Sequence, residues 1–338
     1  MLNSGSKINY GIRSAKSAER KMMCDLLHLL HSAVPAYHPT QYVGMGSKYF
    51  ADFLLFHNEF GFEKMISIEG DEANISRYEY NKPLGCIEIK NGLAGTVLPT
   101  IDWGSHPQSV VWLDYDGSLE RYMPDDVAWL IGNIGIGSVF FVSLNASVSD
   151  TAKSKPRIID GEEVIVLETS KKKEWLKERI GDYCPTDIDE KALTGKNIHR
   201  TFKKIFDRMI DEQIKKRNLL SNSQKCVYRQ LTFIRYRDGA EMLTFGGILA
   251  DEAMNNKLIG QKLSDKRIFI LEDRDAEPCA IEIPKLTYKE VQELLKRMPL
   301  ADAEKELPTL AGISEKEIES FSKIYRYYPH FVQAMISN

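Results

Sequence analysis

The chain has 338 residues, about twice the usual size of a domain, so it can bury a full core as one large domain or as two modest ones. Hydrophobic residues make up 43% and charged residues 28%, a balance that excludes wholesale disorder. Lys and Arg total 45 against 48 for Asp and Glu, so no overall positive field draws the chain to nucleic acid. No apolar run reaches the roughly 18 to 20 residues of a membrane span.

The N-terminal segment and the cysteines favour a reducing compartment. Residues 1–21 contain no apolar stretch of the kind that directs secretion. The five cysteines form no C-x-x-C pair, so neither structural zinc nor a disulfide framework is predicted. We therefore expect a cytoplasmic protein.

The first predicted element is an amphipathic helix from Ser14 to Ser32, within an N-terminal segment over residues 1–37. Methionines and leucines recur at helical spacing and form its apolar stripe. The other side carries charged side chains, namely Arg13, Lys16, Glu19 and Arg20.

After this helix, short apolar runs that end in Gly, Asn or Asp alternate with segments of helix length. Intervals of roughly 20 to 25 residues between such runs are typical of strand-helix-strand units and predict a parallel sheet. The predicted strands are Gln41 to Gly44, Lys64 to Ile68, Gly85 to Ile89, Val110 to Leu113 and Ser138 to Leu144.

The second half of the chain is predicted to hold an insertion, a hairpin and a helical end. The insertion covers about residues 150–222 and closes with a long helix from Ile198 to Leu220. The Asp238-Gly239 turn predicts a hairpin that completes a main domain over residues 38–255. For residues 256–338 we expect a small helical region with a short strand at Arg267 to Leu271. Two capping boxes there predict the helices Thr287 to Met298 and Ser314 to Tyr325.

Polar residues follow three of the predicted strands and indicate a ligand site. Gly44-Met45-Gly46-Ser47 leaves the first strand and leads into a helix, so bare backbone N–H groups can approach a ligand. Glu69 ends the second strand, where nucleoside sites place an acid for the ribose hydroxyls. Asn91-Gly92 ends the third strand.

With these motifs the chain resembles the class I S-adenosylmethionine (SAM) dependent methyltransferases. The segments Tyr-Val-Gly-Met-Gly-Ser, Ile-Ser-Ile-Glu, Trp-Leu-Asp-Tyr-Asp and Tyr-Arg-Tyr-Tyr-Pro also resemble those of a group of bacterial O-methyltransferases. The resemblance implies an α/β fold with a Rossmann-like, seven-stranded sheet whose last strand is antiparallel. It implies SAM as cofactor, bound by a methionine-side turn, a ribose acceptor and an adenine-side contact. The methionine-side turn would be Gly44, Gly46 and Ser47. The ribose acceptor would be Glu69, and the adenine-side contact would be Asn91 with Gly92.

The fourth strand ends in Asp114-Tyr115-Asp116, which resembles the Asp-x-Asp of catechol-type O-methyltransferases. We expect Asp114 to orient the cofactor, Tyr115 to form an aromatic wall and Asp116 to accept the acceptor's hydroxyl proton. Tyr115 as a plain core residue is the alternative. A magnesium ion on Asp114 is a further alternative. No metal is predicted, because the fifth strand offers only Ser143-Leu144-Asn145 to complete its oxygen shell.

Several alternatives stay open at this stage. Val43 stands where the family places an acid and Lys48 replaces the third glycine, which keeps a non-catalytic SAM- or nucleotide-sensing module as a rival reading. An RNA methyltransferase would use the basic residues of the helix from Ile198, but nucleic-acid binding is not favoured. The aromatic run from Tyr325 to Phe331 is expected to dock rather than to stack on bases. The acceptor, a small molecule or a protein, is unknown, and a partner protein or a homo-oligomer is an option.

Overall fold

The computed structural model describes residues 13–148, 152–159, 162–169, 172–195, 197–220, 225–300 and 312–329. The strands in these ranges are β1 (Gln41–Gly44), β2 (Lys64–Glu69), β3 (Ile87–Asn91), β4 (Ser109–Ser118), β5 (Val139–Asn145), β6 (Ala152–Ile159), β7 (Glu162–Thr169), β8 (Val227–Asp238), β9 (Ala240–Ala250) and β10 (Cys279–Ile281). In this part of the chain one eight-stranded sheet has the order β10-β8-β9-β5-β4-β1-β2-β3, and β6 pairs with β7 alone.

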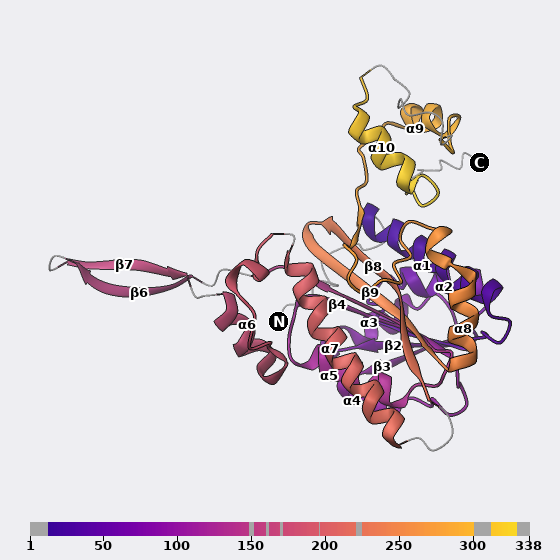
Figure 1. Cartoon of the computed structure of the whole chain (residues 1–338), viewed down its shortest axis with the longest axis horizontal. Coiled ribbons are helices and arrows are strands. Elements are labelled where there is room, and N and C mark those ends of the chain that lie inside the picture. The colour runs from indigo at the N-terminus through magenta and orange to yellow at the C-terminus, as the bar shows by residue number, and fades with distance from the viewer. Residues whose placement is uncertain are drawn as a thin grey trace.

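Helices cover both faces of the large sheet (Figure 1). They are α1 (Ser14–Ala33), α2 (Ala51–Phe60), α3 (Ile75–Asn81), α4 (Ala94–Val97), α5 (Tyr122–Asn133), α6 (Lys172–Ile180), α7 (Asn197–Leu220), α8 (Glu252–Gln261), α9 (Tyr288–Leu295) and α10 (Glu315–Ile324). Short 3₁₀ turns are η3 (Glu72–Asn74), η4 (Leu98–Thr100), η5 (Gly181–Tyr183), η6 (Glu190–Leu193) and η7 (Leu263–Asp265). One buried core joins the sheet to α1, α2, α3 and α8, and a second joins its other face to α4, α5, α6 and α7.

The strand pairing confirms the predicted α/β fold with a Rossmann-like sheet. Strands β1 to β5 pair in parallel, because each crossover carries a helix. Strand β9 lies antiparallel between β5 and β8, and Gly239, with a φ of 93°, makes the tight turn of the β8–β9 hairpin. The described residues contain eight strands in this sheet rather than the seven predicted, since β10 adds a parallel edge strand beside β8.

The strand predicted at Arg267 to Leu271 is wrong. This segment forms a turn, and only Ile270 makes an isolated bridge, to Thr232. Phe269 and Ile270 are buried all the same, so the apolar run reflects packing against the sheet rather than strand pairing. The edge strand lies farther on, at β10.

The predicted insertion contains a two-stranded antiparallel hairpin, β6 with β7, that the sequence analysis did not anticipate. Figure 1 shows it projecting from the rest of the chain. The insertion ends, as predicted, in the long helix α7, which packs on α5 and on the sheet. Lys171 and Lys196, two cations of this stretch, lie outside the described residues.

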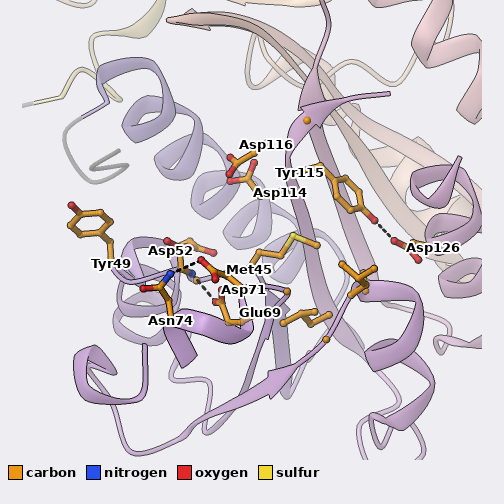
Figure 2. A pocket seen from close by; sticks show the side chains of 18 of the residues that line it. Met45, Tyr49, Asp52, Glu69, Asp71, Asn74, Asp114, Tyr115, Asp116 and Asp126 are labelled. Carbon is orange, nitrogen blue, oxygen red and sulfur yellow. Dashed lines mark hydrogen bonds between the residues drawn. The ribbon is translucent and has the colours of Figure 1, made fainter. Parts of the chain in front are cut away.

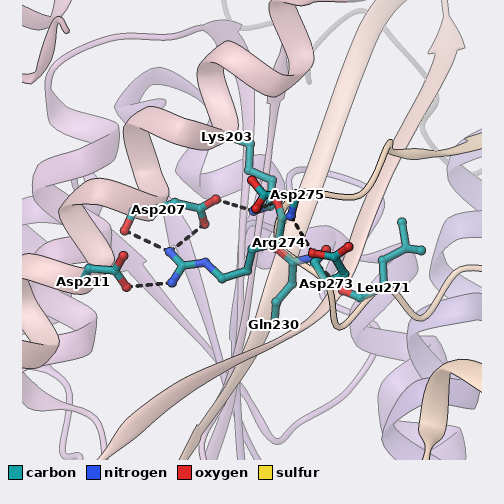
Figure 3. Close-up of polar contacts among 8 residues, drawn as sticks. All are labelled: Lys203, Asp207, Asp211, Gln230, Leu271, Asp273, Arg274 and Asp275. Carbon is teal, nitrogen blue, oxygen red and sulfur yellow. Dashed lines mark hydrogen bonds and ion pairs between the residues drawn. The ribbon is translucent and has the colours of Figure 1, made fainter.

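The basic side of α7 is partly used inside the fold (Figure 3). Lys203 is 1% exposed and pairs with Asp207, and burial lowers the pKa of its ammonium group. Arg274 reaches the same helix, with its guanidinium 3.1 Å from Asp207 and 2.7 Å from Asp211. Gln230 of β8 donates to the carbonyl oxygens of Leu271 and Asp273. Lys203 therefore anchors the 271–275 segment to α7 and does not face a nucleic acid.

The C-terminal helices begin where the capping boxes predict. Thr287 accepts from the backbone N–H of Glu290, and Ser314 accepts from that of Glu317. The aromatic segment after α10 docks as expected, because Tyr327 and Tyr328 are buried and Tyr328 donates to the carbonyl of Pro284. The last two residues of the aromatic run, His330 and Phe331, lie outside the described residues.

Candidate functional site

The carboxyl ends of β1 to β4 meet at one edge of the sheet, where parallel α/β sheets bind ligands. A pocket of about 970 Å³ lies there (Figure 2). Ligand pockets span about 300 to 1,000 Å³, so this one has room for more than a single small group. Its lining brings together most of the predicted site residues, namely Gly46, Ser47, Glu69, Gly92, Asp114, Tyr115 and Asp116.

The glycine turn after β1 is bonded directly to the acid at the end of β2. The backbone N–H of Ser47 donates to Glu69 Oε1 at 2.7 Å, and the Ser67 hydroxyl donates to the same oxygen at 2.6 Å. The N–H of Gly46 in turn donates to Ser67 Oγ at 2.9 Å. Because β1 and β2 are parallel neighbours, the turn and the acid form one hydrogen-bonded unit.

Glu69 is 4% exposed and lines the pocket. Burial raises the pKa of its carboxyl to about 7, although the hydrogen bonds from Ser67 and Ser47 oppose that shift. A carboxyl of this kind changes its charge near neutral pH. Any ligand that needs two acceptor oxygens at this position therefore binds in a pH-dependent way.

The two glycines of the turn serve different purposes. A Cβ at Gly46 would come within 2.5 Å of the Phe50 ring and 2.9 Å of Ser67 Oγ, so only glycine fits beside the turn's own hydrogen bond. A Cβ at Gly44 would lie 2.6 Å from the hydroxyl of Tyr42. That hydroxyl donates to Asp52, which lines the pocket. Gly44 itself is buried in β1 and is not part of the lining.

The third strand contributes through the residues just after it. Gly92, with a φ of 145°, Leu93 and Ala94 line the pocket. Asn91 ends β3 as an exposed residue paired in register with Glu69, and it is not among the lining residues. Its predicted contact to an adenine stays a prediction.

Asp114 at the end of β4 is held by the N-terminal helix. Lys16 Nζ lies 2.8 Å from Asp114 Oδ1 and 2.9 Å from Glu19 Oε2. The same ammonium lies 4.4 Å from the centroid of the Trp112 ring. Burial by itself would lower the pKa of Lys16, but the charges of Asp114 and Glu19 outweigh it and raise that pKa.

The charged side of α1 is therefore not a solvated face. Lys16, Glu19 and Arg20 are 3%, 0% and 6% exposed. Burial raises the pKa of Glu19 despite the neighbouring Lys16. The sequence pattern assigned these residues to the polar side of an amphipathic helix. They are buried because α1 lies against the ends of β4 and β8, where Asp114 offers a charge partner.

Tyr115 and Asp126 form the opposite wall of the pocket (Figure 2). The Tyr115 hydroxyl donates to Asp126 Oδ2 at 2.7 Å, and both residues are buried. Burial raises the pKa of Asp126 to about 6, against the hydrogen bond from Tyr115, which lowers it. The sequence analysis missed Asp126, although an acid between Met123 and Val127 on the apolar side of α5 is an unusual signal.

Asp116 is exposed and lines the pocket beside Asp114, and the two carboxylates lie close together in Figure 2. The charge of the described lining is strongly one-sided. Arg20 is its only basic side chain, and the sequence analysis gave no pocket role to this residue. Its acids are Asp52, Glu69, Asp71, Glu72, Asp114, Asp116 and Asp126. Such a pocket favours a ligand that carries positive charge.

The residues do not fit the magnesium shell considered for Asp114. Its Oδ1 accepts from Lys16, and Asn145 Oδ1 on β5 accepts from the N–H of Ser147 at 2.9 Å. Ser143 Oγ accepts from Trp112 Nε1 at 2.9 Å. Within the described ranges, no group of three or more His, Cys, Asp or Glu side chains could hold a metal ion.

Within the same described ranges, no helix is long and apolar enough to cross a membrane.

A family model described as "Putative O-methyltransferase" matches residues 8–336 of the chain. A search of curated proteins found no match. Among solved structures, a putative S-adenosylmethionine-dependent methyltransferase from Listeria monocytogenes is 11% identical to this chain. The alignment covers 66% of this chain and 96% of the Listeria chain, with a TM-score of 0.36.

Two further solved structures show similar values. The O-methyltransferase TomG from Streptomyces achromogenes, involved in tomaymycin synthesis and solved with SAM, is 13% identical over 73% of this chain and 93% of its own, with a TM-score of 0.35. An O-methyltransferase from Bacillus cereus, solved with S-adenosylhomocysteine (SAH), is 14% identical over 67% of this chain and 80% of its own, with a TM-score of 0.32.

Proposed function

The chain belongs to the putative O-methyltransferase family, and from this premise we propose that its pocket binds SAM and transfers the methyl group to a hydroxyl oxygen of an acceptor. The observation that carries the proposal is the acid-lined pocket at the ends of β1 to β4, with Glu69 bonded to the glycine turn. SAM brings a sulfonium cation and an ammonium group, which suit a lining with seven carboxylates.

Each part of the cofactor has a proposed position along the sheet edge. Glu69 accepts hydrogen bonds from the ribose hydroxyls, as acids at the second strand of dinucleotide sites do. The adenine lies toward Gly92 and Leu93 after β3. The methionine part extends past Gly46 and Ser47 toward β4, which places the sulfonium methyl near Asp114 and Asp116.

The chemistry needs alignment and a base. The acceptor's hydroxyl oxygen attacks the methyl carbon as the carbon–sulfur bond breaks, which leaves a methyl ether and SAH. The hydroxyl proton goes to a carboxylate within hydrogen-bond reach. Asp114 accepts from Lys16 and is tied to helix α1, and Asp116 is an exposed residue that lines the pocket where the acceptor enters. We therefore assign the base to Asp116 and the orientation of the methyl-bearing end to Asp114.

The acceptor is a small molecule or a segment of a protein that enters beside Asp116. Exposed aromatic side chains line this pocket at Tyr49 and Tyr122, and they offer stacking surface to an apolar acceptor. The cytoplasmic location predicted from the sequence stays a prediction.

The test begins with mass spectrometry of the purified protein for co-bound SAM or SAH, followed by calorimetry with both. Glu69→Ala should weaken SAH binding at least tenfold, since a hydrogen bond to a charged group contributes about 1.5 to 3 kcal/mol. Glu88→Ala, at a partly exposed pair with Lys64 outside the pocket, is the matched control and should bind normally. Unchanged affinity in a folded Glu69→Ala variant would refute the ribose assignment.

Turnover separates the enzyme from the alternative of a sensing module. SAH release is measured with panels of hydroxyl-bearing compounds, first phenols and catechols and then alcohols. Tight SAH binding without turnover on any of them would favour the sensor.

A further inference from the structure

Among the residues that the structure describes, the one cation in the lining of the pocket comes from the N-terminal helix. Arg20 lies on α1, two dozen residues before the glycine turn, and it is 6% exposed while it lines the pocket. Burying a guanidinium costs free energy unless anionic groups face it. The acids of the lining supply such groups, and Arg20 in turn brings a positive charge to the lining.

The surroundings of Arg20 place it at the β1 and β4 side of the pocket. Burial raises the pKa of Asp52, and the charge of Arg20 is the largest effect that opposes this. Asp52 begins α2, just after the glycine turn, and its partner Tyr42 lies on β1. The charge of Arg20 also opposes the rise in the pKa of Lys16, which pairs with Asp114 on β4. It acts on Tyr42 of β1 as well, so Arg20 is an electrostatic neighbour of groups on α1, α2 and β1.

This end of the pocket carries both signs of charge. Arg20 contributes a positive charge to the lining there, and Asp52 and Asp114 contribute negative charges. A zwitterionic amino-acid group matches such a pair of opposite charges, because its carboxylate and its ammonium each find a partner. The ribose end, around Glu69 and Asp71, has only acids among its charged lining residues.

We infer that Arg20 binds the α-carboxylate of the methionine part of the cofactor. The inference rests on the proposed function and extends it. With the ribose on Glu69 at β2 and the adenine toward β3, the rest of the cofactor must extend toward β1 and β4, where Arg20 lies. Helix α1 therefore supplies part of the cofactor site, although it precedes the Rossmann-like sheet in the sequence.

Two probes that differ by the amino-acid group test this assignment. SAH carries the carboxylate and the ammonium, whereas 5′-methylthioadenosine shares the adenosine and the sulfur but lacks both. Calorimetry on the full chain should show the wild type binding SAH at least tenfold more tightly. Arg20→Met should weaken SAH binding by about 10- to 100-fold, the range of a charge-assisted hydrogen-bond pair, and leave methylthioadenosine binding within about twofold.

Controls separate the carboxylate contact from general damage. Binding of methylthioadenosine by Arg20→Met itself shows that the pocket is folded. Arg237→Met makes the same change at a guanidinium whose side chain is 74% exposed on the β8–β9 hairpin, outside this pocket, and should bind both probes normally. If Arg20→Met does not fold, Arg20→Lys replaces it. Lysine keeps the charge but not the two-pronged geometry, so SAH binding should fall severalfold with methylthioadenosine unchanged.

The outcomes are distinct. Equal loss of both probes, or unchanged SAH binding in a folded Arg20 variant, would overturn the assignment while leaving SAM dependence intact. A wild-type chain that binds neither probe would overturn the proposed function together with this inference.

Discussion

The two ends of the pocket are built in different ways. The end that we propose for the ribose, called the ribose end below, consists of Ser47, Ser67 and Glu69 and comes from one turn and the next strand along the chain. The methyl end consists of Asp114 and Asp116 of β4 with Lys16 and Glu19 of α1 behind them, and joins segments about a hundred residues apart. At the ribose end, side-chain oxygens accept hydrogen bonds from backbone N–H groups and from a hydroxyl. The methyl end is held instead by a cluster of opposite charges.

This difference predicts how each end responds to change. A carboxylate held by N–H and O–H donors titrates as a single group, so pH should disturb the ribose end first. A buried charge cluster is balanced only when all members are present, so deletion of one member should disturb the methyl end first.

The largest expected effect is on the stability of the methyl end. Lys16→Met leaves Glu19 and Asp114 without their shared cation, and breaking a buried charge pair in this way costs about 3 to 5 kcal/mol of unfolding free energy. Urea unfolding at constant pH measures it. Lys64→Met, at the partly exposed pair with Glu88, is the matched control and should change stability by less than about 1 kcal/mol. Equal effects of the two substitutions would remove the contrast between a buried cluster and a surface pair.

The next effect concerns turnover at the same end. Asp116→Asn should lower turnover about a hundredfold and leave SAH affinity nearly unchanged, because the base acts only on the acceptor. Asp114→Asn should weaken SAH binding as well, since its carboxylate helps to orient the methyl-bearing end. Both are measured as SAH release with an acceptor found in the panel. Parental turnover in both variants would contradict the assignment of the β4 acids.

The ribose end should show the pH dependence. Glu69 has a pKa of about 7 and must be ionised to accept both ribose hydroxyls. SAH affinity should therefore fall about 25-fold between pH 7.5 and pH 5.5, the drop expected for one required deprotonated group. Calorimetry across this range measures it. The slope should vanish in Glu69→Gln and persist in Asp126→Asn, whose parent carboxyl titrates lower, near 6.

The raised pKa of Glu69 also affects the stability of the unliganded protein, but with the opposite pH dependence. Affinity for SAH falls as the pH falls, whereas this part of the stability falls as the pH rises. The folded state holds the Glu69 proton more tightly than an unfolded chain, whose Glu titrates near 4.5. This contribution is fully present below about pH 4.5 and is lost as pH rises through about 7. Glu69→Gln should flatten that part of the profile of unfolding free energy against pH. A profile that stays unchanged would show that Glu69 titrates normally.

The smallest expected effect is on the wall opposite the charge cluster. Tyr115→Phe removes the hydroxyl that donates to Asp126 at 2.7 Å and should cost about 1 to 2 kcal/mol of unfolding free energy, because the Asp126 oxygen is left buried without that donor. Thermal unfolding at pH 7.5 measures the loss. Tyr288→Phe, at a side chain 70% exposed on α9, is the control and should be neutral. A neutral Tyr115→Phe would indicate that water replaces the hydroxyl.

The contact between the glycine turn and Glu69 could be predicted from the sequence because its signals are local. A glycine turn after one strand and an acid at the end of the next strand come together whenever the two strands pair in parallel, as β1 and β2 do. The hairpin turn at Gly239 and the capping boxes at Thr287 and Ser314 were equally readable, because each depends on neighbouring residues only.

The error at Arg267 to Leu271 has a different source. Hydrophobicity reports burial, and Phe269 and Ile270 are buried, but it does not say whether the backbone of a buried segment pairs with a strand. The edge strand β10 has only three residues, Cys279–Ile281, too few to show a period. Whether so short a segment forms an edge strand depends on the strand beside which it packs, here β8.

The sequence by itself determined strands β1 to β5, the β8–β9 hairpin and the residues at the strand ends, because these follow from periodicity and turn chemistry along the chain. Only the tertiary structure decided that Lys16, Glu19 and Arg20 are buried and that Tyr115 meets Asp126. A helix with charges on one side appears solvated when it is considered alone. Whether those charges meet water or an opposite charge depends on a strand end far along the chain, and that information exists only once the chain has folded.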